Sequence, residues 1–223
     1  MPIDRKRSGT LHSWQLIARQ AAETDLASLL AAARSCRFCV PEKIPEAYPV
    51  LELDPATKPR IIIASQAPGR IAHETKLTFN DPSGDRLRDW MGIDRTTFYD
   101  TSKIAIIPMG LCYPGKAASG DKPPIAECKQ IWHKHFFDFL SATPLILAVG
   151  AHSQLWHLGK RREKNLTETV RNFKDYLAQK EAPSIFPIPH PSPLNNIWLK
   201  RNPWFEELAL PALKQNIRLA LAE

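Results

Sequence analysis

The segment from Arg60 to Gly69 (RIIIASQAPG) places three consecutive isoleucines before a short turn that ends in Pro68 and Gly69. A β-branched run of this kind is typical of a strand that is buried on both faces, as in a parallel sheet. Open α/β sheets bind their ligands beyond the carboxyl ends of their strands, which is where this turn lies. Gly69 lets a ligand approach the backbone closely, and Pro68 restricts the chain beside it. Taken alone, the segment is explained better as a simple strand exit than as a binding loop.

Three more apolar runs and several segments with helical periodicity predict the rest of the fold. The apolar runs, which we expect to be strands, cover residues 103–108, 145–149 and 184–188. We expect helices over residues 12–33 (one long or two short), 84–91, 125–140, 151–158, 166–180 and about 203–222, the last with an interruption at Pro211. Residues 40–59 carry five prolines and predict an extended connection, and we expect loops over residues 70–85 and 113–124.

Strands that alternate with helices predict a parallel sheet that is covered on both faces. The sequence therefore predicts an α/β fold, a three-layer α/β/α sandwich with a central four-stranded parallel sheet. We expect one domain over residues 1–223, with residues 1–10 flexible, because a chain of 223 residues fits one large α/β domain.

The charge balance favours a polyanionic partner. The chain has 30 Lys and Arg residues against 23 Asp and Glu residues, a net charge of +7. Such an excess suits nucleic acid, although many basic proteins bind none. The basic start of the chain is not followed by an apolar segment, and no run is long enough to cross a membrane. We therefore expect a soluble cytoplasmic protein without a membrane partner. We also expect it to be a monomer.

The exit of the last expected strand is a second candidate binding turn. It reads His190-Pro191-Ser192-Pro193-Leu194. In a parallel sheet the carboxyl ends of the strands lie at one edge, so this turn and the turn at Ser65–Gly69 can meet across one cleft. That coincidence favours a site at this edge.

Four cysteines, Cys36, Cys39, Cys112 and Cys128, include one C-x-x-C pair and two distant thiols. Structural disulfides are rare in a cytoplasmic protein. A local pair and two distant thiols can form a four-thiolate metal or iron–sulfur site that the fold closes. The same pattern also fits a redox-active pair or four unrelated reduced cysteines.

The two strand exits together resemble the uracil-DNA glycosylase superfamily. In that family one strand ends in a motif such as G-Q-D-P-Y, G-E-x-P-G or G-x-N-P-G, and the last strand ends in H-P-S-P-L or a relative of it. The matching segments here are Ser65–Gly69 (SQAPG) and His190–Leu194 (HPSPL). The resemblance implies a monofunctional N-glycosylase of base-excision repair. Such a hydrolase would flip uracil out of uracil-containing DNA and hydrolyse its N-glycosidic bond.

The cysteines extend this resemblance to the family 4 and family 5 members, which carry a [4Fe–4S] cluster. Cys36, Cys39, Cys112 and Cys128 fall at the places of the four ligands, with fifteen residues between the last two as in family 4. The resemblance implies a structural cluster that attaches the N-terminal helix to a loop beside the DNA-binding face.

The resemblance also implies roles for three residues of the second motif. His190 would donate a hydrogen bond to a carbonyl oxygen of the departing base. Leu194 would fill the space that the base leaves in the helix, and Ser192 would hold a DNA phosphate. From the residues alone, His190 can be a buried histidine satisfied by backbone, Leu194 an ordinary exposed leucine, and Ser192 a turn cap.

The first motif departs from the family because it has no carboxylate. The family places Asp or Glu where this chain has Ala67 and Gln66. Family 5 members instead take an aspartate from a following segment of the form F-T-G-D-x-S-G, and residues 79–84 (FNDPSG) resemble it with one residue fewer. Asp81 is therefore the candidate for positioning water or stabilising the sugar, or else it initiates a turn before Pro82. Gln66 can orient water without accepting its proton.

A second departure concerns recognition of the base. Phe79 lies ten residues after Gly69, where the family has the aromatic residue that stacks on the flipped base. Pro108 stands where the family often reads uracil with Asn, and Ala67 and Gly69 would complete the base pocket. The loss of the Asn amide predicts relaxed selectivity, extending to other deaminated or damaged bases.

The basic loop of this chain lacks the histidine through which one branch of the superfamily traps uracil covalently. Residues 113–127 contain no histidine, so covalent capture is not expected. Arg70, Arg201 and the basic segment at residues 160–164 are candidates for contacts with the DNA backbone, unless they are ordinary solvated charges.

Two other functions remain compatible with the sequence. One is a damage-sensing DNA-binding member of the same superfamily that has lost catalysis, which the residues Gln66, Ala67 and Pro108 favour. The other is an unrelated α/β protein that binds a nucleotide or phosphate through the loop after Ile63. Against this second alternative, the sequence has no glycine-rich phosphate loop, and phosphate binding would explain neither His190 nor the cysteines.

Overall fold

The structure is a computed structural model and describes residues 10–178 and 183–222. The flexibility expected of residues 1–10 falls almost entirely outside the described part of the chain. Within that part, four parallel strands form one sheet in the order β2-β1-β3-β4. The strands are β1 (Ile61–Ala64), β2 (Ile104–Ile106), β3 (Leu145–Val149) and β4 (Ser184–Ile188).

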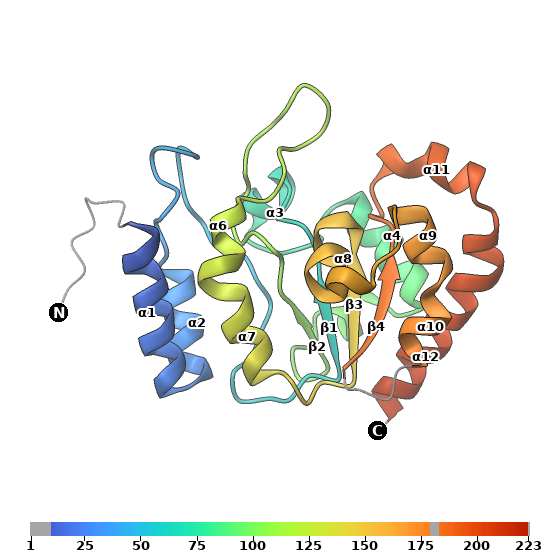
Figure 1. Cartoon of the computed structure of the whole chain (residues 1–223), viewed down its shortest axis with the longest axis horizontal. Coiled ribbons are helices and arrows are strands. Elements are labelled where there is room, and N and C mark those ends of the chain that lie inside the picture. The colour runs from blue at the N-terminus through green and yellow to red at the C-terminus, as the bar shows by residue number, and fades with distance from the viewer. Residues whose placement is uncertain (1–9, 179–182, 223) are drawn as a thin grey trace.

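Helices cover both faces of this sheet, as Figure 1 shows. The α-helices are α1 (Leu11–Thr24), α2 (Leu26–Arg34), α3 (Arg70–Thr75), α4 (Pro82–Met91), α5 (Arg95–Phe98), α6 (Ala126–Cys128), α7 (Lys134–Phe139), α8 (Gly150–Leu158), α9 (Leu166–Arg171), α10 (Phe173–Leu177), α11 (Asn196–Arg201) and α12 (Leu210–Ala222). Short π-helical segments lie at η1 (Lys129–His133) and η4 (Phe205–Ala209), and 3₁₀ turns at η2 (Gly159–Arg161) and η3 (Pro193–Asn195).

The strand β1 supplies both halves of the core because successive side chains of a strand point to opposite faces. Ile62 and Ala64 pack with residues of α1, α2 and α7 on one face. Ile61 and Ile63 pack with residues of α4, α10 and α12 on the other. All four side chains are fully buried. The predicted three-layer α/β/α sandwich with a four-stranded parallel sheet is therefore confirmed.

The prediction of an uninterrupted loop over residues 70–85 was wrong. A short helix, α3, starts directly after Gly69, and α4 starts at Pro82, two residues before the expected start. Asp81 is the N-cap of α4, and its side chain accepts a hydrogen bond from the Gly84 amide over 2.9 Å. Pro82 occupies the first turn, where its missing N–H costs no hydrogen bond.

The pattern over residues 12–33 forms two helices, one of the two expected alternatives, because Asp25 ends the first and caps the second through Ser28. Two other expected helices differ from the prediction in their detail. The pattern over 166–180 divides at Asn172 into α9 and α10, and its last two residues lie outside the described part of the chain. Pro211 does not interrupt the C-terminal helix, because it lies in the first turn of α12, directly after the π-helical segment η4.

No helix among the described residues combines the length and the apolar character that crossing a membrane requires.

A buried histidine, His133, and a half-buried one, His157, link η1 to α8. The Nε2 atoms of His133 and His157 lie 3.1 Å apart, so one ring donates a hydrogen bond to the other. Burial lowers the pKa of His157 from 6.5 to about 3. Burial also lowers the pKa of His133, and the neighbouring His157 adds to this effect. Both rings are therefore neutral in the folded protein.

We expect this pair to make the protein sensitive to acid. The unfolded chain binds a proton at His157 below pH 6.5, whereas the folded chain does not until about pH 3. Stability therefore falls as the pH drops below 6.5, by about 2 kcal/mol at about pH 5 from His157 alone. Urea unfolding at about pH 7.5 and about pH 5 measures this loss, and in His157→Gln the loss is smaller by that amount. The measurement at the higher pH is the control, and an equal loss in both proteins would contradict the prediction.

Candidate active site

A cavity of about 350 Å³ lies between the exits of β1 and β4. Its volume is within the range of small-ligand pockets. Its walls include the whole turn Ser65–Gly69 and three members of the second turn, His190, Ser192 and Leu194. The expectation that the two strand exits share one cleft is therefore confirmed.

His190 is held as a neutral hydrogen-bond donor. Its Nδ1 accepts a hydrogen bond from the Ser192 amide over 3.2 Å, and its carbonyl oxygen accepts one from Asn195 Nδ2 over 2.7 Å. A backbone amide can only donate, so Nδ1 is the acceptor and the ring hydrogen is on Nε2. Burial lowers the pKa of His190 below 6.5, against the opposing charges of Asp81 and Asp121. The imidazole at the cavity wall is therefore neutral at pH 7, with an N–H to donate.

Phe79 lines the cavity in an unusual backbone conformation. Its φ is +53°, which is uncommon for a residue with a side chain and requires support from its surroundings. A Cβ at Gly84 would lie 1.7 Å from the Phe79 carbonyl oxygen, so only glycine fits there. The Phe79 ring packs edge-on against Phe98 with 6.1 Å between the ring centres.

Hydrogen bonds from three elements fix the segment around Phe79. Glu52 accepts from the Thr78 amide over 3.0 Å, and Tyr99 donates its hydroxyl to the Thr78 carbonyl over 2.7 Å. Arg88 donates to the Phe79 carbonyl over 3.3 Å. The ring is thus presented to the cavity by a rigid frame, as stacking on a flat ligand requires.

Asp81 caps a helix with one carboxylate oxygen and lies at the cavity wall with the other. Its Oδ1 caps α4, which is the structural role. Its Oδ2 lies 3.9 Å from the point where a Cβ of Gly69 would be, beside the first motif and at the cavity wall. One carboxylate oxygen is therefore occupied by the helix, while the other faces the site.

Gln66 packs across the start of α8. Its Nε2 lies 2.6 Å from the point where a Cβ of Gly150 would be, and Gly150 has a φ of +80°. A side chain at position 150 would therefore displace Gln66 and strain the backbone.

The remaining base-binding candidates lie where the exits of β1 and β2 join. The Gly110 amide donates to the Gln66 carbonyl over 2.8 Å. A Cβ on Gly110 would lie 3.5 Å from the Cβ of Ala67. Ala67, Gly69 and Pro108 all line the cavity.

Asp121 is a cavity residue that the sequence reasoning missed. It lies in the loop 113–124, which rises above the carboxyl edge of the sheet at the top of Figure 1. Its Oδ2 is 3.4 Å from the point where a Cβ of Gly69 would be. The signal was available, because Asp121 is the only acidic residue in this Gly-, Pro- and Lys-rich loop.

The predicted DNA-contacting residues lie around the cavity mouth or on the outer surface. Leu194 is 70% exposed at the rim. Ser192 caps the turn η3 by accepting from the Leu194 amide over 3.2 Å, and its carbonyl accepts from Arg86, a second residue that the sequence reasoning missed. Arg70 is exposed and pairs with Glu74 over 2.7 Å.

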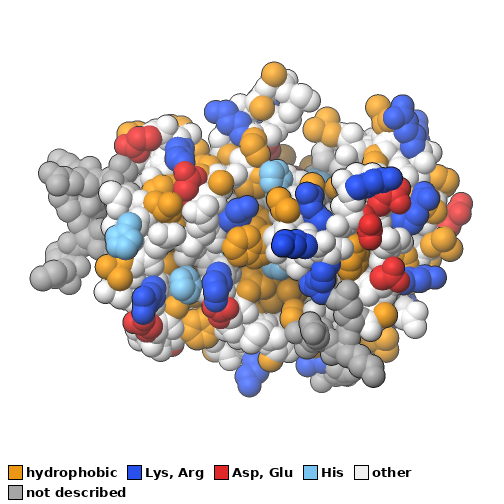
Figure 2. Space-filling view, viewed as in Figure 1, with side chains coloured by type: hydrophobic (Ala, Val, Ile, Leu, Met, Phe, Trp, Pro, Cys, Tyr) orange, Lys and Arg blue, Asp and Glu red, His pale blue; other side chains and the backbone are white. Residues whose placement is uncertain are grey.

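Other basic side chains lie outside the cavity. Arg201 is exposed at the end of α11. The basic segment 160–164 follows α8, and Figure 2 shows Lys and Arg side chains on the face that carries α8.

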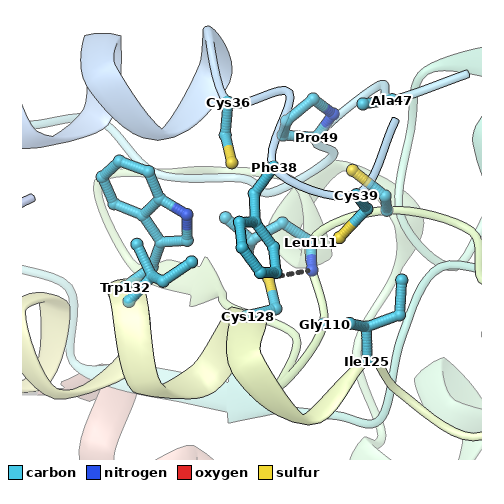
Figure 3. A pocket seen from close by; sticks show the side chains of 12 residues that line it. Cys36, Phe38, Cys39, Ala47, Pro49, Gly110, Leu111, Ile125, Cys128 and Trp132 are labelled. Carbon is cyan, nitrogen blue, oxygen red and sulfur yellow. Dashed lines mark hydrogen bonds between the residues drawn. The ribbon is translucent and has the colours of Figure 1, made fainter. Parts of the chain in front are cut away.

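The four cysteines line one small, mostly apolar cavity between the N-terminal helices and α6. Figure 3 shows Cys36, Cys39 and Cys128 around it, together with the ring of Trp132. None of the four thiols is in a disulfide. The Leu111 amide donates to the Cys128 sulfur over 3.2 Å, which is a contact that stabilises a thiolate. Burial raises the pKa of Cys39 and of Cys112 to about 12, and neighbouring cysteines add to the effect.

Four thiols around one cavity are the kind of donor set that holds an iron–sulfur cluster. Within the described part of the chain, no group of three or more His, Cys, Asp or Glu side chains converges closely enough for one ion. A cluster offers a separate iron atom to each sulfur, so its ligands need not meet at one point. The side chains leave about 10 Å³ free between them, so a bound cluster requires side chains of the lining to move outward.

The sequence of the chain matches a known protein family. The model of the uracil DNA glycosylase superfamily matches residues 52–214, well over half of the chain. The match covers β1 to β4 and both strand exits, and it leaves Cys36 and Cys39 outside. It rules out the unrelated nucleotide- or phosphate-binding protein as an interpretation. The parallel sheet, the shared cleft and this match together show that the chain belongs to the uracil DNA glycosylase superfamily.

Proposed function

We propose that the protein is a monofunctional DNA glycosylase that removes uracil from DNA at the start of base-excision repair. Membership of the superfamily supports a DNA glycosylase in general. The observation that carries the finer proposal is the neutral His190, which shares one cavity with Phe79 and the first motif. A neutral donor is what a departing pyrimidine needs, because negative charge develops on its carbonyl oxygen as the glycosidic bond breaks.

Under this proposal, the residues around the cavity would contact different parts of a flipped nucleotide. The base would stack on Phe79 and receive a hydrogen bond from Nε2 of His190. Leu194, exposed at the rim, would enter the stack that the base has left. The Ser192 segment, the exposed Arg70 and Arg201, and the basic side chains near α8 would contact phosphates.

Asp81 would position the attacking water. The first motif contributes no carboxylate, but Oδ2 of Asp81 lies beside Gly69 of that motif. Gln66 would orient the water without accepting its proton, because an amide is not a base.

The base pocket would discriminate weakly between bases. Pro108 offers no side-chain hydrogen bond at the wall where the family often has Asn. A wrong base then leaves no buried amide unpaired, so the usual cost of a mismatch is small. We therefore propose that the enzyme also removes other deaminated or damaged bases.

A damage-sensing role without catalysis is the second candidate. The specific observation in its favour is the first motif, where neither Gln66 nor Ala67 can act as a base. Binding and base flipping would then be retained while the bond stays intact.

We expect excision of uracil that depends on His190. An oligonucleotide with one uracil, incubated with the protein and then treated with hot alkali, breaks at that position. The loss of the donor in His190→Ala lowers the single-turnover rate by about 100- to 1,000-fold.

Strand breaks at other deaminated bases in a panel of oligonucleotides would support relaxed selectivity, whereas cleavage at uracil alone would contradict it. DNA binding by the wild type without any break would favour the damage sensor.

Asp81→Asn separates the two roles of Asp81. Asn caps helices about as well as Asp, so the free energy of unfolding should change by less than about 0.5 kcal/mol. The loss of the charge should lower the excision rate by about 100-fold. Asp94→Asn is the matched control, because Asp94 caps α5 through Thr97 over 2.7 Å. A rate for Asp81→Asn equal to that of the Asp94 variant would leave Asp81 a structural residue only.

We also propose that Cys36, Cys39, Cys112 and Cys128 hold a [4Fe–4S] cluster with a structural role. The four thiols line one cavity and come from the segment after α2, the loop after β2 and the end of α6. Thiolate ligands and a backbone N–H donor to one sulfur are typical of such a site. Hydrolysis of a glycosidic bond needs no electron transfer, so the cluster would attach these segments to one another.

The proposed cluster can be tested directly on the purified protein. We expect iron and acid-labile sulfide in equal amounts and a broad visible absorbance. In Cys112→Ser both are lost and the thermal unfolding midpoint falls, because the segments lose their common attachment. A wild-type preparation free of iron and sulfide that is nevertheless fully folded and active would refute the structural role.

A further inference from the structure

The loop 113–124 holds one acidic residue in a defined position above the cavity. The Ala117 amide donates to the Gly120 carbonyl over 3.0 Å, and the Lys122 amide donates to the Gly115 carbonyl over 2.8 Å. These bonds make the loop a short hairpin in which Lys116 and Asp121 are paired. The backbone of Asp121 is therefore fixed by the hairpin.

The side chain of Asp121 is oriented as well. Its Oδ1 accepts a hydrogen bond from the Tyr113 hydroxyl over 3.2 Å. Its Oδ2 lies 3.4 Å from the point where a Cβ of Gly69 would be, and no hydrogen bond to it is seen among the described residues. Gly69 has no side chain, so this oxygen faces the open cavity beside the first motif.

Two carboxylates from different loops thus meet beside a motif that has none. Asp81 approaches Gly69 from one loop and Asp121 from the other, at 3.9 and 3.4 Å from the same point. Their charges both act on His190 and oppose the fall of its pKa on burial. The three groups therefore belong to one electrostatic site.

His190 and Asp121 lie at different depths in the cavity, as the base and the sugar of a flipped nucleotide would. His190 is half-buried in the cavity wall, whereas Asp121 is exposed at the mouth. The base of a flipped nucleotide enters the cavity, but its sugar remains attached to the DNA backbone and stays near the mouth. When the C1′–N bond breaks, its electron pair leaves on the base and positive charge develops on the sugar. Water then adds to C1′, and its proton is finally taken up by the base.

We propose that Asp121 is a second catalytic carboxylate, whose Oδ2 lies against the deoxyribose ring and stabilises its developing positive charge. This role rests on the proposed glycosylase function. It complements Asp81, which positions the water. The hairpin thereby supplies a negative charge that the first motif, with Gln66 and Ala67, does not.

The rate of excision tests this role. Asp121→Asn keeps an oxygen that can accept from Tyr113 and removes only the charge. We expect its single-turnover rate on a uracil oligonucleotide to be about 100-fold below that of the wild type. Asp89→Asn, an exposed aspartate on α4, is the control and should stay within about twofold of the wild type. A rate for Asp121→Asn within the same limit would overturn the proposal.

Binding to two abasic-site analogues tests the same charge without any reaction. One oligonucleotide carries a pyrrolidine, which is cationic like the transition state, and the other carries a neutral tetrahydrofuran. We expect Asp121→Asn to bind the pyrrolidine about tenfold more weakly than the wild type does, and the tetrahydrofuran equally well or better. Equal effects on both analogues, or none on the pyrrolidine, would overturn the proposal.

The two measurements also distinguish failure of the proposed function from failure of this inference. A wild type that leaves uracil in place but prefers the pyrrolidine through Asp121 would refute uracil as the substrate and support the role of Asp121. A wild type that excises uracil, with Asp121→Asn unchanged in both measurements, would do the opposite.

Discussion

The burial of β1 on both faces is the constraint on which the rest of the molecule depends. Its four side chains are fully inaccessible and helices cover each face, as is usual for a sheet of parallel strands such as this one. The exits of β1 and β4 consequently open at one edge, although their motifs lie more than a hundred residues apart in sequence. The position of the cleft therefore follows from the packing of β1 within the parallel sheet.

Backbone constraints then determine what the cleft can hold. Phe79 keeps its left-handed conformation because Gly84 leaves room for its carbonyl oxygen, and Gln66 keeps its place because Gly150 has no side chain. These contacts all lie within the chain, so the folded chain itself contributes to the shape of the site.

The sequence predicted the sheet well because long β-branched runs and the alternation of elements are strong local signals. It also predicted which residues line the cavity at both strand exits, because parallel topology brings those exits together. It failed after Gly69, where a loop was expected and the short helix α3 begins, and at Asp81, whose side chain caps α4 two residues before the expected start. It did not place Asp121 in the cavity. The lone acidic residue of the loop is visible in the sequence, but its position beside Gly69 depends on how the hairpin folds back over the cleft.

The contact between the hairpin and the rim has one consequence for how DNA is engaged. A methyl group of Leu194 lies 3.3 Å from the point where a Cβ of Gly120 would be, so the hairpin tip rests against the exposed leucine. If Leu194 enters a base stack, as proposed, it would leave this contact, and insertion would exchange one apolar contact for another. The position of the hairpin would then be coupled to the insertion of Leu194, and a change in the length of the hairpin would alter both.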